Sequence, residues 1–238
     1  MSKKLLFVFL LLFHISAIRS LGVVEAHYSI PPGLIDRFLF SQSKDSSEFP
    51  PLKLLQTALA GYEILIGEQS VSRPEVITII DFSLPSDMKR LWVLDLINGK
   101  VLFRCLVSHG RNSGDLMAKK FSNIPGSNAS SPGFYATGET YIGKHGLSLA
   151  LDGLEAGIND KARERAIVIH GADYVSADFI RKYGRLGRSL GCPAVPEELS
   201  KGIIQTIKGG SCLFIYAPEK SYTSNSQIIT KITSATKG

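Results

Sequence analysis

The 238-residue sequence contains only three cysteines, three methionines and one tryptophan. It contains neither a Cys-x-x-Cys pair nor a His-Glu-x-x-His motif, the spacings typical of protein zinc sites. Its 27 basic residues form no cluster and no stripe interleaved with aromatic side chains, so nothing indicates nucleic-acid binding. We therefore expect no metal, no cofactor and no nucleic-acid partner. The sequence does not indicate an oligomeric state.

Long apolar runs are absent except at the N-terminus. There "MSKK", "LLFVFLLLF" and "HISAIRS" form the basic, apolar and small-residue order of a secretory signal peptide. The apolar run is too short for a transmembrane helix. Removal of residues 1–20 deletes three basic residues and no acidic one, so the formal net charge falls from +6 to +3. We expect a soluble protein exported to the periplasm or cell envelope.

Composition divides the rest of the chain into three parts. Residues 21–70 form a polar, Pro-rich leader and an amphipathic helix that starts at Leu52, where apolar residues recur in steps of three and four. Residues 71–220 form one folded domain. Residues 221–238 are rich in Ser and Thr, and we expect them to be a flexible tail.

Short β-type segments dominate the central part. Two apolar runs joined at Asn98-Gly99 predict a hairpin with a two-residue turn. Further strands are expected in "VITIIDF", "GFYATGETYIGKHGLSLALDG", "AIVIH" and "SCLFIYAP". Helices are expected in "VSADFIRKYG", with Ser176 as N-cap and Gly184 as stop, and in "PEELSKGIIQTI". The fold class is therefore mainly β with short helices.

Cys192 stands apart from the other two cysteines. Cys105 and Cys212 lie in apolar strand-like runs, which indicates buried thiols, with a disulfide between them left open. Cys192 lies in "GRLGRSLGCPAVP", a Gly- and Pro-rich loop with no apolar wall. Either this is an ordinary turn with an incidental cysteine, or the loop presents a reactive thiol.

A cysteine nucleophile needs a base, and histidine is the usual one. His170 ends the predicted strand "AIVIH", and the carbonyl of Gly171 is placed to receive the other imidazole N–H. Arg188 would favour the thiolate. The consecutive amides of Gly191 and Cys192 would stabilise an oxyanion.

Other residues are weaker candidates for the same cleft. His109 and His145 each precede a glycine and would line the cleft or bind substrate, and a zinc site of His170, Cys192 and a third histidine is the rival interpretation. Substrate contacts are also expected among Tyr135, Thr137, Tyr141 and Lys144, and carboxylate binding by Arg185 and Arg188. The loop from Arg111 to Ser131 is long enough to be functional or disordered.

The segment "IVIHGADYVSADFIRKYGRLGRSLGCPAVP" resembles the active-site region of the murein L,D-transpeptidase catalytic-domain family. The resemblance runs from about Pro74 to Pro218 and includes "HGRNSG" and "GFYATGETYIGKHG". It implies Cys192 as nucleophile, His170 as base and Gly171 as the residue that orients the base, with Ser189 and Gly191 at fixed motif positions. Two departures are clear: Leu190 replaces the usual second histidine, and "PAVP" lacks the usual Arg or Asn two residues after the cysteine. Both match a subgroup with a Ser-x-Gly-Cys-Pro motif.

This resemblance implies a mixed β-sheet or sandwich with the N-terminal helix packed on it. It also implies a reaction on peptidoglycan stem tetrapeptides: a thioester on Cys192, release of terminal D-alanine, and transfer to a second stem or to a D-amino acid. Two alternatives remain, an L,D-carboxypeptidase or amidase with the same Cys–His pair, and a catalytically inactive wall-binding module.

Overall fold

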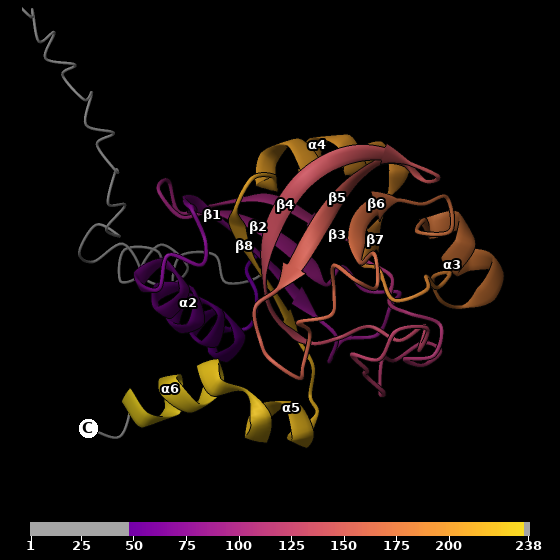
Figure 1. The fold of residues 1–238 in the computed structure, drawn as a ribbon. Coiled ribbons are helices and arrows are strands. Elements are labelled where there is room, and N and C mark those ends of the chain that lie inside the picture. The colour runs from indigo at the N-terminus through magenta and orange to yellow at the C-terminus, as the bar shows by residue number, and fades with distance from the viewer. Residues whose placement is uncertain (1–47, 236–238) are drawn as a thin grey trace, which may run out of the picture.

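The computed structural model describes residues 48–235; the predicted signal peptide and most of the leader lie outside this range. Eight strands form one curved sheet in the order β3-β2-β1-β8-β4-β5-β6-β7 (Figure 1). The pairs β1–β8 and β6–β7 are parallel and the others antiparallel. The chain is thus mainly β with short helices, as predicted.

The strands are β1 (Arg73–Asp81), β2 (Leu91–Asp95), β3 (Lys100–Cys105), β4 (Gly133–Gly143), β5 (Gly146–Gly153), β6 (Val168–Gly171), β7 (Ala194–Val195) and β8 (Ser211–Tyr216). The helices are α2 (Leu52–Gly67), α3 (Ala177–Tyr183), α4 (Glu197–Ile207), α5 (Lys220–Asn225) and α6 (Gln227–Ala235). None of these helices is long and apolar enough to cross a membrane.

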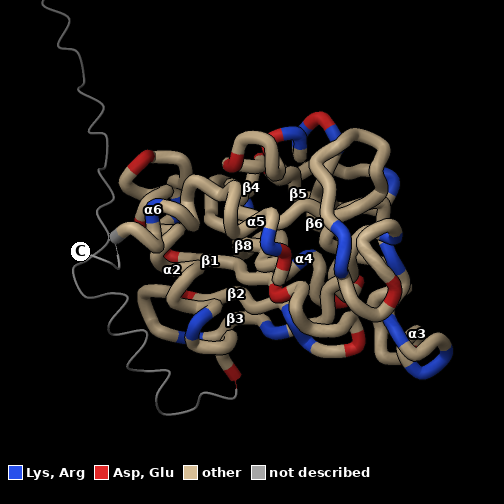
Figure 2. Tube along the Cα trace, turned by 90° about the horizontal axis from the view of Figure 1, so that it is seen from below, with Lys and Arg blue, Asp and Glu red and all other residues tan. Residues whose placement is uncertain are grey.

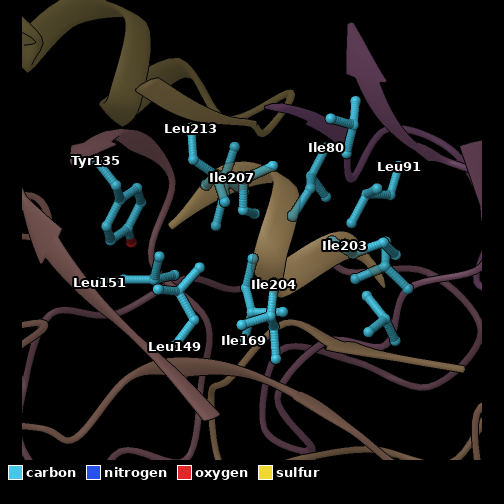
Figure 3. Close-up of a cluster of buried hydrophobic side chains, with 14 of the residues drawn as sticks. Ile80, Leu91, Tyr135, Leu149, Leu151, Ile169, Ile203, Ile204, Ile207 and Leu213 are labelled. Atoms are coloured by element: carbon cyan, nitrogen blue, oxygen red, sulfur yellow. The ribbon is translucent and has the colours of Figure 1, made fainter. Parts of the chain in front are cut away.

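The two largest hydrophobic clusters pack on the sheet. One combines the buried face of α4 with strand residues that include Ile80, Leu149 and Leu213 (Figure 3). The other places α2 against β1, β2, β4 and β8, so the predicted N-terminal helix does pack on the sheet. Burial of this much apolar surface is the main source of stability, and it fixes β6 and β7 at one end of the sheet.

All three cysteines are free thiols. Cys105 packs in the cluster under α4 and Cys212 in the cluster under α2. The question left open by the sequence is therefore answered: these two buried cysteines do not pair.

Local signals predicted several elements correctly. The helix from Leu52 extends to Gly67. At α3, the Ser176 hydroxyl accepts from the Phe179 N–H at 3.3 Å, and Gly184 ends the helix with φ 72°. The predicted hairpin is formed by β2 and β3, but its loop is longer than two residues, because Asp95 pairs with Lys100. The Asp95 carboxylate holds this loop by accepting from the Ile97 and Asn98 amides.

The C-terminal segment differs from the flexible tail that we expected. Residues 220–235 form α5 and α6, in which Tyr222 and Ile228 are buried. The reason is a buried carboxylate: Glu155 accepts from the Phe134 amide at 2.8 Å and also from the hydroxyls of Tyr222 and Ser226. A buried carboxylate is tolerated only when hydrogen bonds satisfy it, so α5 and α6 complete the domain.

Candidate active site

The parallel pair β6–β7 places the chain segments that carry Cys192 and His170 side by side. His170 lies on β6 opposite Ala194 on β7, and Cys192 precedes Ala194 by two residues. We call Ser189–Cys192 the nucleophile turn, after the predicted role of Cys192. Since β7 is an edge strand of the sheet, this turn lies at the sheet margin beside the end of β6.

Hydrogen bonds of Ser189 fix the nucleophile turn. The Ser189 hydroxyl donates to the Cys192 carbonyl at 2.6 Å and accepts from the Gly191 amide at 3.1 Å. The Ser189 amide donates in turn to the His109 carbonyl at 3.0 Å. Because the Gly191 amide is already engaged, the predicted oxyanion site made of the Gly191 and Cys192 amides is not present in this arrangement.

The Cys192 thiol is partly buried and faces the segment that leads into β6. Its Sγ donates to the Ala166 carbonyl at 3.7 Å. Burial raises the pKa of Cys192, while the Val168 backbone and the Arg165 guanidinium lower it. The resting thiol is therefore protonated and needs a base before it can act as a nucleophile.

His170 has the orientation that a base requires. Its Nδ1 lies 2.9 Å from the Gly171 carbonyl oxygen. A carbonyl only accepts, so Nδ1 carries the proton and Nε2 of the neutral ring is free to take one. Burial lowers the pKa of His170 below that of a free imidazole, which keeps the ring neutral at pH 7. The expected hydrogen bond to Gly171 is present, while the catalytic roles of both residues stay predictions.

The other predicted contacts fall into exposed and buried groups. His145 is exposed at the tip of the β4–β5 hairpin, where its ring stacks on His170 with centroids 4.5 Å apart. Tyr141 and Lys144 are exposed on the same hairpin, and Tyr141 shares a register row with Ser148 and His170. Tyr135 and Thr137 are buried in the sheet, so they do not reach the substrate side.

His109 is not a cleft residue, which corrects our expectation. Its side chain is 0% exposed. Arg90, equally buried, donates through Nη2 to His109 Nδ1 at 2.8 Å, so the ring proton is on Nε2. Burial and the Arg90 charge lower the pKa of His109 to about 4. The Arg90–His109 pair stabilises the nucleophile turn, because the His109 backbone carbonyl accepts from the Ser189 amide.

Arg188 also has a different environment from the predicted one. Its guanidinium donates to the Gly114 carbonyl at 2.9 Å and pairs with Asp115, which also pairs with Arg185. These contacts hold the segment that contains Arg185 and Arg188 against residues 111–115. The guanidinium whose charge opposes the rise in the pKa of Cys192 is that of Arg165, which sequence reasoning missed because "RERAIVIH" looks like an exposed charged approach to a strand.

Backbone strain next to Cys192 was also missed. Ala166 has φ 51° and Asn128 has φ 54°, and non-glycine residues in this region cost about 1–2 kcal/mol. Ala166 supplies the carbonyl that faces the Cys192 thiol. Asn128 is adjacent to Ala129, whose carbonyl oxygen would lie 2.9 Å from a Cβ on Gly191. Such strain concentrates at functional sites.

The rim of the site is partly apolar. Leu190, in the position of the usual second histidine, is 58% exposed. Helix α3 projects from the body of the domain and carries the basic residues Arg181 and Lys182 (Figure 2). Among residues 48–235, no group of three or more His, Cys, Asp and Glu side chains could hold a metal ion.

A family model described as the L,D-transpeptidase catalytic domain matches residues 48–216. That range includes Cys192, His170 and the strands that carry them. The chain therefore belongs to the L,D-transpeptidase catalytic domain family. A sequence search of the curated proteins finds no match.

Solved structures of L,D-transpeptidases match at low identity. One from Mycobacterium smegmatis is 14% identical with a TM-score of 0.37, over 60% of this chain and 59% of that chain. One from Mycobacterium tuberculosis H37Rv is 12% identical with a TM-score of 0.40, over 60% and 58%. The helical cell shape determining protein Pgp2 from Campylobacter jejuni is 17% identical with a TM-score of 0.40, over 66% and 54%. This chain thus spans less than two thirds of each of them, and the scores carry no argument about activity.

Proposed function

We propose that the protein is a cysteine acyl transferase that acts on peptidoglycan stem tetrapeptides. The observation that carries the proposal is the Nδ1 hydrogen bond of His170 to the Gly171 carbonyl at 2.9 Å, on the strand paired with the one that Cys192 precedes. It leaves Nε2 of the neutral ring free to accept a proton, and the partly buried Cys192 thiol lies on the segment that leads into the paired strand β7. Family membership supports the same chemistry.

In the first half-reaction, His170 Nε2 takes the Cys192 thiol proton. The sulfur attacks the carbonyl carbon of the third stem residue, and a C–S bond forms. Collapse of the tetrahedral intermediate breaks the C–N bond to terminal D-alanine, whose amine leaves with a proton from the His170 imidazolium. The product is a thioester on Cys192.

In the second half-reaction, an amine of another stem or of a D-amino acid attacks the thioester carbonyl. A C–N bond forms, the C–S bond breaks, and His170 removes the surplus amine proton. Water as the acceptor would instead give a tripeptide acid. The acceptor alone therefore separates a transferase from an L,D-carboxypeptidase.

Incubation of the protein with disaccharide-tetrapeptides, followed by mass spectrometry, tests this proposal. Crosslinked dimers that lack one D-alanine, or exchange of terminal D-alanine for an added D-amino acid, indicate a transferase. Tripeptides alone indicate the hydrolase, and unchanged but retained muropeptide indicates a wall-binding module. Cys192→Ala abolishes product formation, whereas Cys105→Ala, which removes a buried thiol, retains it.

We also propose that the protein works in the periplasm or cell envelope, because residues 1–20 have the pattern of a signal peptide. Cell fractionation and N-terminal sequencing of the exported protein test this. A chain that remains cytoplasmic with Met1 intact would contradict it.

A further inference from the structure

The residues after Cys192 provide no positive charge to the nucleophile. Ala194, two residues on, is fully buried in β7, and its carbonyl accepts from the Ser108 amide at 2.8 Å. A cation close to Cys192 would therefore have to come from another part of the sequence.

Arg165 reaches the nucleophile turn from the segment before β6. A Cβ built on Gly191 would lie 3.2 Å from the Arg165 Nη2 and 2.9 Å from the Ala129 carbonyl oxygen. Gly191 also has φ 128°, a conformation that side chains disfavour. The absence of a side chain at position 191 thus lets the guanidinium lie directly against the turn.

Hydrogen bonds hold the Arg165 guanidinium in this position. Nη1 donates to the Ser122 carbonyl at 2.7 Å and to the Ser131 hydroxyl at 2.5 Å. Nη2 donates to the Ala129 carbonyl at 2.5 Å and the Ser127 hydroxyl at 3.3 Å. Ser130, within the same segment, donates to the Gly191 carbonyl at 3.0 Å. Arg165 therefore anchors the 122–131 segment, and this segment anchors the nucleophile turn.

The charge of Arg165 is not neutralised by a carboxylate. None of the ion pairs within residues 48–235 involves Arg165. Its neighbour Arg163, by contrast, pairs with Asp152 and Glu139, and Arg188 pairs with Asp115. A cation whose ligands are all neutral can still stabilise a nearby anion.

We propose that Arg165 is a positioning residue that fixes the nucleophile turn and favours the Cys192 thiolate, in place of a cation two residues after the cysteine. This inference rests on the proposed function only for the reaction that the thiolate would serve. The thiolate itself forms without substrate, so its formation is tested independently. The other titratable groups that interact with the pair are Tyr135 on β4, which acts on Arg165, and Tyr174 before α3, which acts with Cys192. His170 lies on β6, the strand paired with β7. Burial raises the pKa values of both phenols, so both stay neutral and Arg165 remains the fixed charge.

The test is the rate of Cys192 alkylation by iodoacetamide as a function of pH, with the labelled peptide identified by mass spectrometry. Arg165→Gln removes the charge and raises the apparent pKa of Cys192. At a pH below that pKa the rate falls about tenfold, which corresponds to one pKa unit. Arg165→Lys restores the charge and recovers most of the rate. Arg163→Gln is the matched control and keeps the wild-type profile.

An Arg165→Gln profile identical to that of the wild type would overturn the inference, as would a shift produced by Arg188→Gln instead. If Arg165→Lys shifts as far as Arg165→Gln, the charge has no role and this part of the inference is wrong. Thermal unfolding shows whether each variant folds. Should Arg165→Gln not fold, Arg165→Lys decides, because its apparent pKa must stay at the wild-type value. Lack of turnover on muropeptides would refute the proposed function and leave this result standing.

Discussion

The imidazole rings of His145 and His170 stack, with centroids 4.5 Å apart and planes inclined by 23°. Burial is the main cause that lowers the pKa of His170, the Gly171 carbonyl opposes it, and coulombic interaction with His145 lowers it further. The hairpin tip between β4 and β5 therefore supplies His170 with both a packing surface and an electrostatic neighbour.

We expect His145→Phe to keep a stacked ring and to remove the coulombic interaction with His170. The pKa of His170 then rises. Because the neutral imidazole is the active form, the acidic limb of the pH profile of kcat/KM moves to higher pH. The profile is measured with a tetrapeptide substrate between pH 4 and 9. An acidic limb at the wild-type position in His145→Phe would contradict this electrostatic coupling.

Ser189→Ala removes both hydrogen bonds that its hydroxyl makes to the nucleophile turn. We expect the free energy of unfolding to fall by about 1–2 kcal/mol. Because the turn loses its register, kcat falls by about a hundredfold. Ser189→Thr retains the hydroxyl and serves as the control. Full activity of Ser189→Ala would show that the turn is held by other contacts.

The lowered pKa of His109 predicts how the free energy of unfolding depends on pH. Its folded pKa of about 4 lies below the value of 6.5 for a free imidazole, so the unfolded chain binds the extra proton between these values. Stability is complete above pH 6.5 and is lost as the pH falls toward 4, by about 3 kcal/mol from this group. His109→Asn keeps an acceptor for Arg90 but has no imidazole to titrate. In denaturant titrations its free energy of unfolding therefore lacks this loss between pH 6.5 and 4. An unchanged pH slope in the variant would contradict the buried neutral ring.

His109→Leu is the harsher substitution at the same position. It leaves a donor of the fully buried Arg90 without its imidazole acceptor, and an unsatisfied buried donor costs about 1–3 kcal/mol, more when charged. We expect a lower melting temperature than in His109→Asn, together with slower alkylation of Cys192. Equal stability of the two variants would show that the Arg90–His109 hydrogen bond contributes nothing.

Features specified by neighbouring residues were predictable from the sequence. The α3 caps, the position of the β2–β3 hairpin and the hydrogen bond between His170 and Gly171 each depend on residues a few positions apart. The hairpin loop length was wrong because Asp95 forms its own hydrogen bonds to the loop amides, an interaction that the Asn-Gly signal does not encode.

Features that depend on distant contacts were not predictable. Strand β8 inserts between β1 and β4, so the last strand of the sheet completes its centre. Glu155 orders α5 and α6 only because the fold buries its carboxylate. Arg165 was missed and Arg188 preferred because proximity to Cys192 in sequence was taken for proximity in space.

The most direct test of the account is intact-protein mass spectrometry of the acyl-enzyme, trapped by acid quench seconds after mixing with a tetrapeptide substrate. We predict a mass increase equal to the tripeptide acyl group, located on Cys192 by peptide mapping, sensitive to hydroxylamine and absent in Cys192→Ala. Turnover of the substrate with no adduct on Cys192, or an adduct that persists in Cys192→Ala, would contradict it.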